Sequence, residues 1–151
     1  TMTKKSGMIL AVAIIVSLVI SCKDESRFVE PNYVLRKWAS AIQQLNYREY
    51  ASCEANPKAE EVFREMYREY YLVDVMATDV DDADNAREMK DPNGLRYLSR
   101  HLEFEAAIIQ RKTAKPGGLM RGSVEFIKYI DGGRAKDGWL LSNRTLIHVP
   151  R

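Results

Sequence analysis

Two periods of apolar side chains divide the chain into a helical part and a strand part. From about residue 32 to 45, apolar side chains recur at spacings of one, three and four, the period of an amphipathic helix. Pro31 falls in the first turn of this helix, where its missing N–H is tolerated. Asn46 is a suitable N-cap for a second helix over 47–55, and a third helix is expected over about 58–69.

From residue 70 onward, apolar and polar side chains alternate, which is the period of a half-buried strand. Strands are expected over about 70–78, 95–111, 120–130 and 138–149. The turns between the last three strands are too short for a parallel crossover. Polar residues 79–94 are expected to form a connection that ends in a turn. Helices followed by such a meander predict the α+β class, with N-terminal helices packed on a curved antiparallel sheet in one domain over 31–151.

A separate apolar segment precedes this domain. Lys4 and Lys5 come before a mainly apolar run of about 13 residues, 8–20. A helix of that length rises about 20 Å, which is short of the roughly 30 Å hydrocarbon core of a bilayer. The segment therefore has the charge and length of a secretory signal rather than of a permanent membrane span. We expect residues 1–21 to be a signal peptide and residues 22–30 to be a tether.

The end of the apolar segment, Val19-Ile20-Ser21-Cys22, resembles the bacterial lipobox, in which an aliphatic and a small residue precede a cysteine. The resemblance implies that cleavage falls between Ser21 and Cys22, and that the Cys22 thiol receives a lipid anchor built on fatty acids such as palmitate. Two or more acyl chains are enough for stable anchoring. Two alternatives remain open, namely a secretory signal with an incidental cysteine and an uncleaved anchor on a subunit of a membrane complex.

The three residues after the lipobox are Lys23, Asp24 and Glu25. They resemble the surface-export tether of lipoproteins in the Bacteroidetes group. The resemblance implies attachment to the outer membrane, with the domain facing either the periplasm or the outside. The alternative is that these residues are a solvated spacer without any sorting signal.

Charge and cysteine content narrow the range of partners. The chain holds 23 basic and 21 acidic side chains. The signal contains two lysines and no acid, so the cleaved chain would be neutral, whereas a nucleic-acid-binding domain concentrates a basic excess on one face. We therefore expect no nucleic-acid partner. Cys53 is the only cysteine besides Cys22, and it is expected to be a small packing residue rather than a disulfide partner or nucleophile.

Two segments, VLRKWASAIQQLNYREYAS (34–52) and DGWLLSNRTLIHV (137–149), resemble the nuclear transport factor 2-like superfamily. The resemblance spans about 31–149 and implies a cone made of helices and a curved sheet. It also implies that Trp139 fills the cone, buried near Trp38. Enzymes of this superfamily hold a carboxylate inside the cone, often beside His or Tyr, where burial raises the carboxylate pKa toward neutrality.

Four side chains of the strand part are candidates for such a catalytic role: Asp74, His101, Glu103 and Glu105. Alternation places all four opposite the apolar side chains, on the face where solvated residues belong. We therefore expect a solvated face, with catalysis and a polar binding surface as alternatives. A buried Asp or Glu beside His or Tyr would favour the enzyme, which would be an isomerase or dehydratase of the cone fold.

The aromatic side chains are expected to be mostly core, with a second reading in which some of them line the mouth of the cone. There they would bind an apolar small ligand or a partner peptide. The candidate lining residues are Trp38, Tyr67, Tyr71, Phe104 and Trp139.

Neither a cofactor nor a metal is expected from the sequence. The acidic residues 79–85 lack the spacing, the glycine and the final Glu of a calcium-binding loop. His101 and His148 lack the cysteine partners of a zinc site. The sequence therefore predicts a membrane-anchored envelope lipoprotein that acts as a non-enzymatic binding or accessory module, with an envelope protein or an apolar small molecule as its partner.

Overall fold

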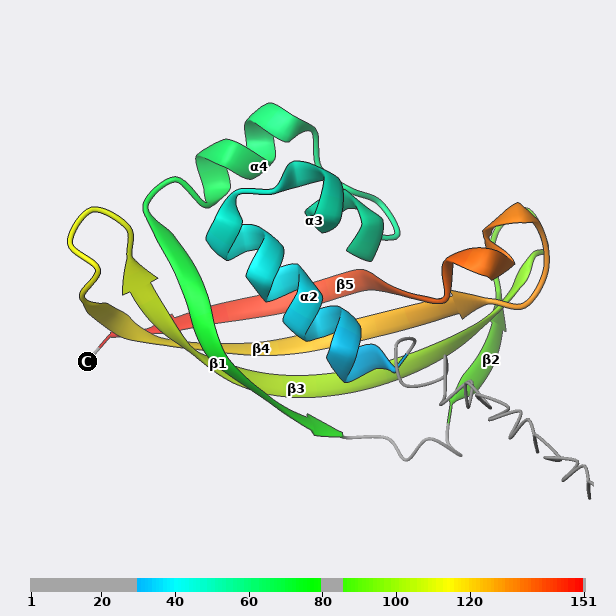
Figure 1. Cartoon of the computed structure of the whole chain (residues 1–151). Coiled ribbons are helices and arrows are strands. Elements are labelled where there is room, and N and C mark those ends of the chain that lie inside the picture. The colour runs from blue at the N-terminus through cyan, green and yellow to red at the C-terminus, as the bar shows by residue number, and fades with distance from the viewer. Residues whose placement is uncertain (1–29, 80–85, 151) are drawn as a thin grey trace, which may run out of the picture.

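The computed structural model describes residues 30–79 and 86–150. Within these residues, three α-helices cover one face of a curved antiparallel sheet (Figure 1). The helices are α2 (Pro31–Gln44), α3 (Tyr47–Cys53) and α4 (Glu60–Met66). The strands are β1 (Tyr70–Asp79), β2 (Arg87–Lys90), β3 (Arg96–Gln110), β4 (Pro116–Tyr129) and β5 (Trp139–Val149), with a short 3-10 helix, η2 (Gly133–Asp137), between the last two. The α+β class is confirmed.

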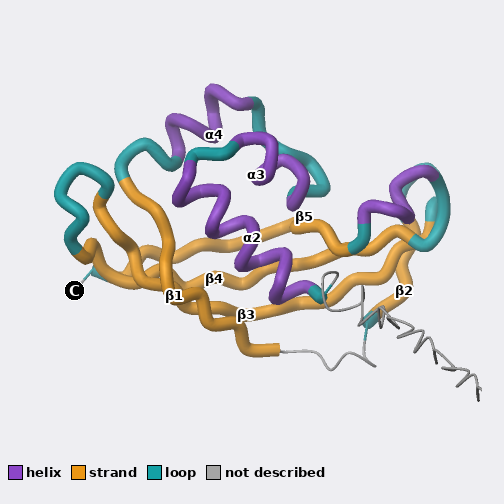
Figure 2. The backbone as a smooth tube through the Cα atoms, in the orientation of Figure 1, coloured by secondary structure: helices purple, strands orange, loops and turns teal. Residues whose placement is uncertain are grey.

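The sheet has the order β1-β3-β4-β5, and every pairing is antiparallel. The short strand β2 pairs with β3 along residues 96–99, beyond the part of β3 that pairs with β1. The long strands bend beneath α2, which is plain in the tube view (Figure 2). The sheet therefore presents one face to the helices, and no helix of the described residues covers the opposite face, here called the outer face.

The helices start and end as the sequence predicts, to within a few residues. Pro31 opens α2, and Leu45 ends it in the left-handed conformation with φ 50°. The Asn46 side chain caps α3 by accepting a hydrogen bond of 3.2 Å from the backbone N–H of Glu49. The third helix, α4, is shorter than its predicted range of 58–69.

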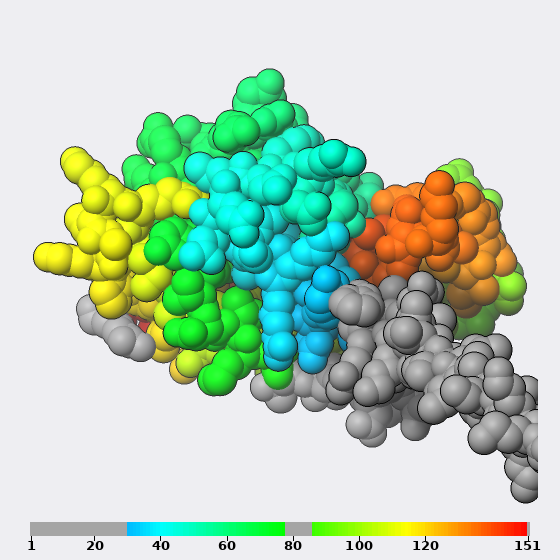
Figure 3. Space-filling model, viewed as in Figure 1, coloured from blue at the N-terminus to red at the C-terminus, as the bar shows by residue number. Residues whose placement is uncertain are grey.

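The core lies between the helices and the inner face of the sheet. The helical part supplies four large aromatic side chains without any exposed surface: Trp38, Tyr50, Phe63 and Tyr67. Their rings are in mutual contact, with centroids 4.4 Å apart for Tyr50 and Phe63. The space-filling view shows the helices closed over the middle of the sheet, while the β3–β4 hairpin (yellow) and the β4–β5 connection (orange) project at its two ends (Figure 3). The inside of the fold is therefore packed with side chains.

Gly122 is required by the packing of the sheet under the helices. It pairs with Phe104 across β3 and β4, and a Cβ atom at Gly122 would lie only 2.3 Å from the Phe104 ring. The ring of Phe104 thus occupies the place where a side chain at position 122 would lie. The absence of a side chain at Gly122 therefore leaves room for the Phe104 ring.

Three details differ from the sequence expectation. Residues 87–90 form a strand inside the predicted polar connection, and residues 133–137 form a 3-10 turn inside the predicted loop. Trp139 is half-buried rather than buried, because it starts β5 at the margin of the core. One face of its ring is covered by the Arg100 guanidinium, 5.9 Å from the ring centroid. The segments 1–29 and 80–85, which include the lipobox and most of the acidic stretch, lie outside the described residues.

The half-burial of Trp139 sets the expected cost of removing it. We expect Trp139→Ala to lower the free energy of unfolding by about 1–2 kcal/mol, because only part of the Trp139 side chain is buried. Removal of a fully buried Trp would cost about 3–5 kcal/mol. Urea denaturation followed by fluorescence measures the loss. A loss of the fully buried size would show that Trp139 belongs to the centre of the core in solution.

Candidate functional site

A buried ion pair joins the end of the helical part to the last strand. Glu54, directly after α3, is 3% exposed, and its two carboxylate oxygens lie 2.6 and 2.7 Å from Nη1 of Arg144 on β5. The indole Nε1–H of Trp38 donates a hydrogen bond of 3.0 Å to Glu54 Oε1. The Arg144 guanidinium also lies over the Trp38 ring, 5.4 Å from its centroid. Both oxygens of the carboxylate are therefore engaged.

The backbone explains how Glu54 reaches the strand. The chain leaves α3 in an extended conformation and forms a parallel bridge between Glu54 and Leu141 of β5. The backbone N–H of the next residue, Ala55, donates to the Leu141 carbonyl at 2.7 Å. On the other side, the β4–β5 register shifts between Val124 and Phe126, just where Arg144 pairs with Val124. This bulge turns the Arg144 side chain toward the helices.

Two tyrosines lie close enough to this ion pair for its charges to affect the pKa of their hydroxyl groups. The hydroxyl oxygens of Tyr50 and Tyr67 are completely buried and have no hydrogen-bond partner among the described residues. Burial raises the pKa of both phenols; the positive charge of Arg144 opposes that rise, and the negative charge of Glu54 adds to it. Burial acts to lower the pKa of the Arg144 guanidinium, but its hydrogen bond and attraction to Glu54 outweigh burial and leave that pKa raised. The guanidinium therefore stays charged.

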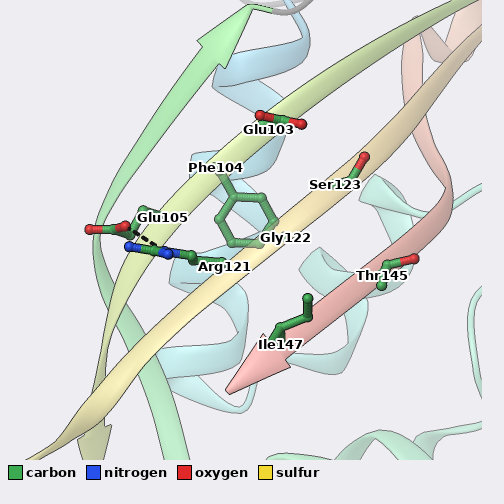
Figure 4. A pocket seen from close by; sticks show the side chains of 8 residues that line it. All are labelled: Glu103, Phe104, Glu105, Arg121, Gly122, Ser123, Thr145 and Ile147. Carbon is green, nitrogen blue, oxygen red and sulfur yellow. Dashed lines mark hydrogen bonds and ion pairs between the residues drawn. The ribbon is translucent and has the colours of Figure 1, made fainter. Parts of the chain in front are cut away.

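A hollow of about 450 Å³ lies on the outer face of the sheet (Figure 4). Glu103, Ser123 and Thr145 stand in one row, because Glu103 pairs with Ser123 and Ser123 pairs with Thr145 across three neighbouring strands. In the next row Arg121 Nε is 3.0 Å from the Glu105 carboxylate. Ile147, 57% exposed, completes the rim.

The floor of the hollow is made by Gly122 and Phe104, which Figure 4 shows in the middle of the surrounding side chains. A smaller hollow of about 180 Å³ adjoins it and shares Ser123 and Thr145 with it. There Glu125 accepts hydrogen bonds from Ser99 Oγ at 3.1 Å and from Asn143 Nδ2 at 3.3 Å, with His101 Nε2 at 3.8 Å.

Three of the four candidate side chains of the strand part lie where alternation predicts, and Asp74 does not. His101, Glu103 and Glu105 are on the outer face, opposite the buried Leu102 and Phe104. Asp74 is exposed on β1 and has φ 53°, at an irregularity in the pairing of β1 with β3. The outer face is therefore the solvated face that the sequence predicts for His101, Glu103 and Glu105, whereas Asp74 lines a shallow hollow beside Arg36 and Ser40 of α2.

The candidate lining residues all belong to one packed core. Trp38 and Tyr67 are fully buried, with ring centroids 6.3 Å apart in an edge-on contact. Phe104 is 4% exposed, and Tyr71 and Trp139 are half-buried at the edge of the same core. The structure thus brings these five residues together in one core, and Phe104 also forms part of the floor of the outer-face hollow. Ser21 and Cys22 lie outside the described residues.

Cys53 is a buried free thiol, as a packing residue should be. Burial raises the pKa of the Cys53 thiol to about 11, so at neutral pH it is protonated and a poor nucleophile.

A comparison with known protein families and with characterised proteins found no match for this chain. In the described part of the chain, each helix is too short or too polar to cross a bilayer.

Proposed function

We propose that this protein is a lipoprotein of the bacterial cell envelope, held on a membrane through lipidated Cys22, and that its domain is a non-enzymatic binding or accessory module. One observation carries the proposal. A basic start, an apolar run of signal length, the small residue Ser21 and Cys22 follow one another in the order that lipoprotein processing requires. Anchoring then follows from the acyl chains, at about 0.8 kcal/mol per buried methylene.

The arrangement of the domain supports this proposal. Helix α2 begins at Pro31, so the tether over 22–30 spans at most about 30 Å when fully extended. The domain would therefore stay close to the membrane surface. We place it in the nuclear transport factor 2-like superfamily, supported by the helices seated in the curve of an antiparallel sheet. The sequence Lys23-Asp24-Glu25 supports attachment to the outer membrane.

A second candidate function is a small-molecule enzyme of the cone fold, and one observation favours it. Glu54 is a buried carboxylate inside the fold, with two buried tyrosines, Tyr50 and Tyr67, beside it. The ion pair weighs against this function, because a general base needs a carboxylate oxygen that can reach the substrate. Arg144 and Trp38 occupy the oxygens of Glu54. The binding module is therefore the better-supported function.

The modification of Cys22 tests the proposal directly. We expect the wild-type protein, extracted from membranes of a bacterial host, to begin at Cys22 and to carry the added mass of a lipid. Cys22→Ala should abolish both the cleavage and the lipid, and Cys53→Ala, which changes the other cysteine, should leave both intact. Intact-mass analysis of the membrane fraction makes the measurement. Wild-type protein found there with residues 1–21 retained and Cys22 unmodified would support the uncleaved anchor instead.

A further inference from the structure

The outer-face hollow is a site whose central polar side chains have no partner in the part of the chain that the structure describes. The side chains of Glu103, Ser123 and Thr145 make no hydrogen bond or ion pair with any described residue, although they are neighbours across three strands. Directly opposed side chains in a sheet have Cβ atoms about 4.5–5.5 Å apart, so a ligand group over Ser123, the middle residue of the row, has Glu103 on one side and Thr145 on the other. The row therefore offers a carboxylate and two hydroxyl oxygens to a single group.

Charge limits what that group can be. The Arg121 cation is matched by Glu105 at 3.0 Å, so among the described residues that line the larger hollow the Glu103 carboxylate is the unmatched charge. An anion is therefore disfavoured. A metal ion is disfavoured as well, because the described residues contain no cluster of three or more His, Cys, Asp or Glu side chains that could hold one. A compact cation with several N–H donors fits this set of acceptors, and a primary ammonium group has three such donors.

The rim adds an apolar surface beside this polar row. Ile147 lies two residues along β5 from Thr145, on the same face, and is 57% exposed. An alkyl chain of a few carbons that leads to an ammonium at Glu103 would cover Ile147. This is the shape of a lysine side chain, an aliphatic stem with a charged head.

We propose that the outer-face hollow binds the side chain of a lysine presented by a protein partner, with the ammonium group at Glu103, Ser123 and Thr145 and the stem on Ile147. A partner protein is favoured over a free amine because the hollow is open. Pockets for small ligands enclose most of the ligand surface, whereas Glu103 and Ile147 are exposed, so a partner surface must cover the rest. The proposal rests on the domain being a binding module but not on its lipid anchor.

The test uses the full-length protein in detergent micelles and short peptides as probes. The first peptide is Gly-Gly-Lys-Gly-Gly with both ends blocked, and the second is the same peptide with an acetylated lysine. Addition of the lysine peptide should shift the amide resonances of Gly122, Ser123 and Thr145. The acetylated peptide should bind at least tenfold more weakly, because acetylation removes the charge.

Two variants and one small molecule decide the outcome. Glu103→Gln should weaken binding of the lysine peptide about tenfold or more, and Glu61→Gln, an exposed acid on α4, should leave binding unchanged. Equal binding of the acetylated peptide, or an unaffected Glu103→Gln, would overturn the proposal. Tighter binding of 1,4-diaminobutane than of the lysine peptide would overturn the protein partner in favour of a free amine. None of these results depends on the mass of the N-terminus, which tests the lipid anchor. The lysine site and the lipid anchor can therefore be disproved independently.

Discussion

Glu54→Gln is expected to lower the free energy of unfolding by about 3–5 kcal/mol, because it leaves the Arg144 charge buried without its partner. The pair is almost fully withdrawn from water, with 2% of the Glu54 side chain and 14% of the Arg144 side chain exposed. The Trp38 indole loses a charged acceptor at the same time. Domains of this size are stable by about 5–15 kcal/mol in total, so the loss is a large fraction of that stability. Urea denaturation followed by Trp fluorescence measures it.

The control for this variant is an ion pair at the surface of the same helices. Lys37 and Glu49 are 3.3 Å apart with 37% and 47% of their side chains exposed. Glu49→Gln should cost less than about 1 kcal/mol, since water competes for both charges. Similar losses for Glu54→Gln and Glu49→Gln would show that Glu54 is solvated in solution.

A double variant separates the ion pair from the packing around it. Glu54→Met combined with Arg144→Met removes both charges and keeps side chains of similar length in the interior. It should cost clearly less than the sum of the two single variants, because no unpaired charge remains. Additive losses would mean that the two side chains do not interact in the folded protein.

The period of the apolar side chains was enough to predict most of the fold. It placed α2, α3 and the long strands to within a few residues, because each of them has one face in the core. It did not predict β2, whose four residues are all exposed and therefore carry no alternation. The burial of Trp139 was overestimated, because the resemblance placed this residue at the centre of the cone. Trp139 is the first residue of β5, and this position leaves part of its ring in solvent.

The candidate sites depended on different kinds of information. The alternation along β3 was enough to place Glu103 and Glu105 on the outer face. The ion pair of Glu54 and Arg144 was not predicted, because the two residues are 90 positions apart. In addition, the bulge in the β4–β5 pairing interrupts the alternation along β5, so alternation alone does not predict that Arg144 lies on the inner face. Polar residues on the inner face could only have been found once the register of the last strand was known.

Arg111 is another residue whose role was not visible in the sequence, and it is expected to hold the end of α2 in place. It follows β3 in the hairpin to β4, and its guanidinium donates hydrogen bonds to the backbone carbonyls of Ile42, Gln43 and Tyr67, the last two at 2.8 Å each. The last four carbonyls of a helix have no partner within the helix, and a cation near them is favoured by the helix dipole. The guanidinium also lies 5.2 Å from the centroid of the Tyr71 ring.

We therefore expect Arg111→Met to lower the free energy of unfolding by about 3 kcal/mol, because three hydrogen bonds from a charged donor are lost while the alkyl stem stays. Arg111→Lys should recover only part of this loss. The planar guanidinium donates in several fixed directions at once, whereas a single ammonium group cannot reach all three carbonyls. Arg68→Met is the matched control: its ion pairs with Glu65 and Glu69 are exposed, and its removal should cost less than about 1 kcal/mol. Urea denaturation of the three variants makes the comparison. If Arg111→Lys were as stable as the wild type, the positive charge alone would account for the cap, and the hydrogen bonds to the three carbonyls would contribute little.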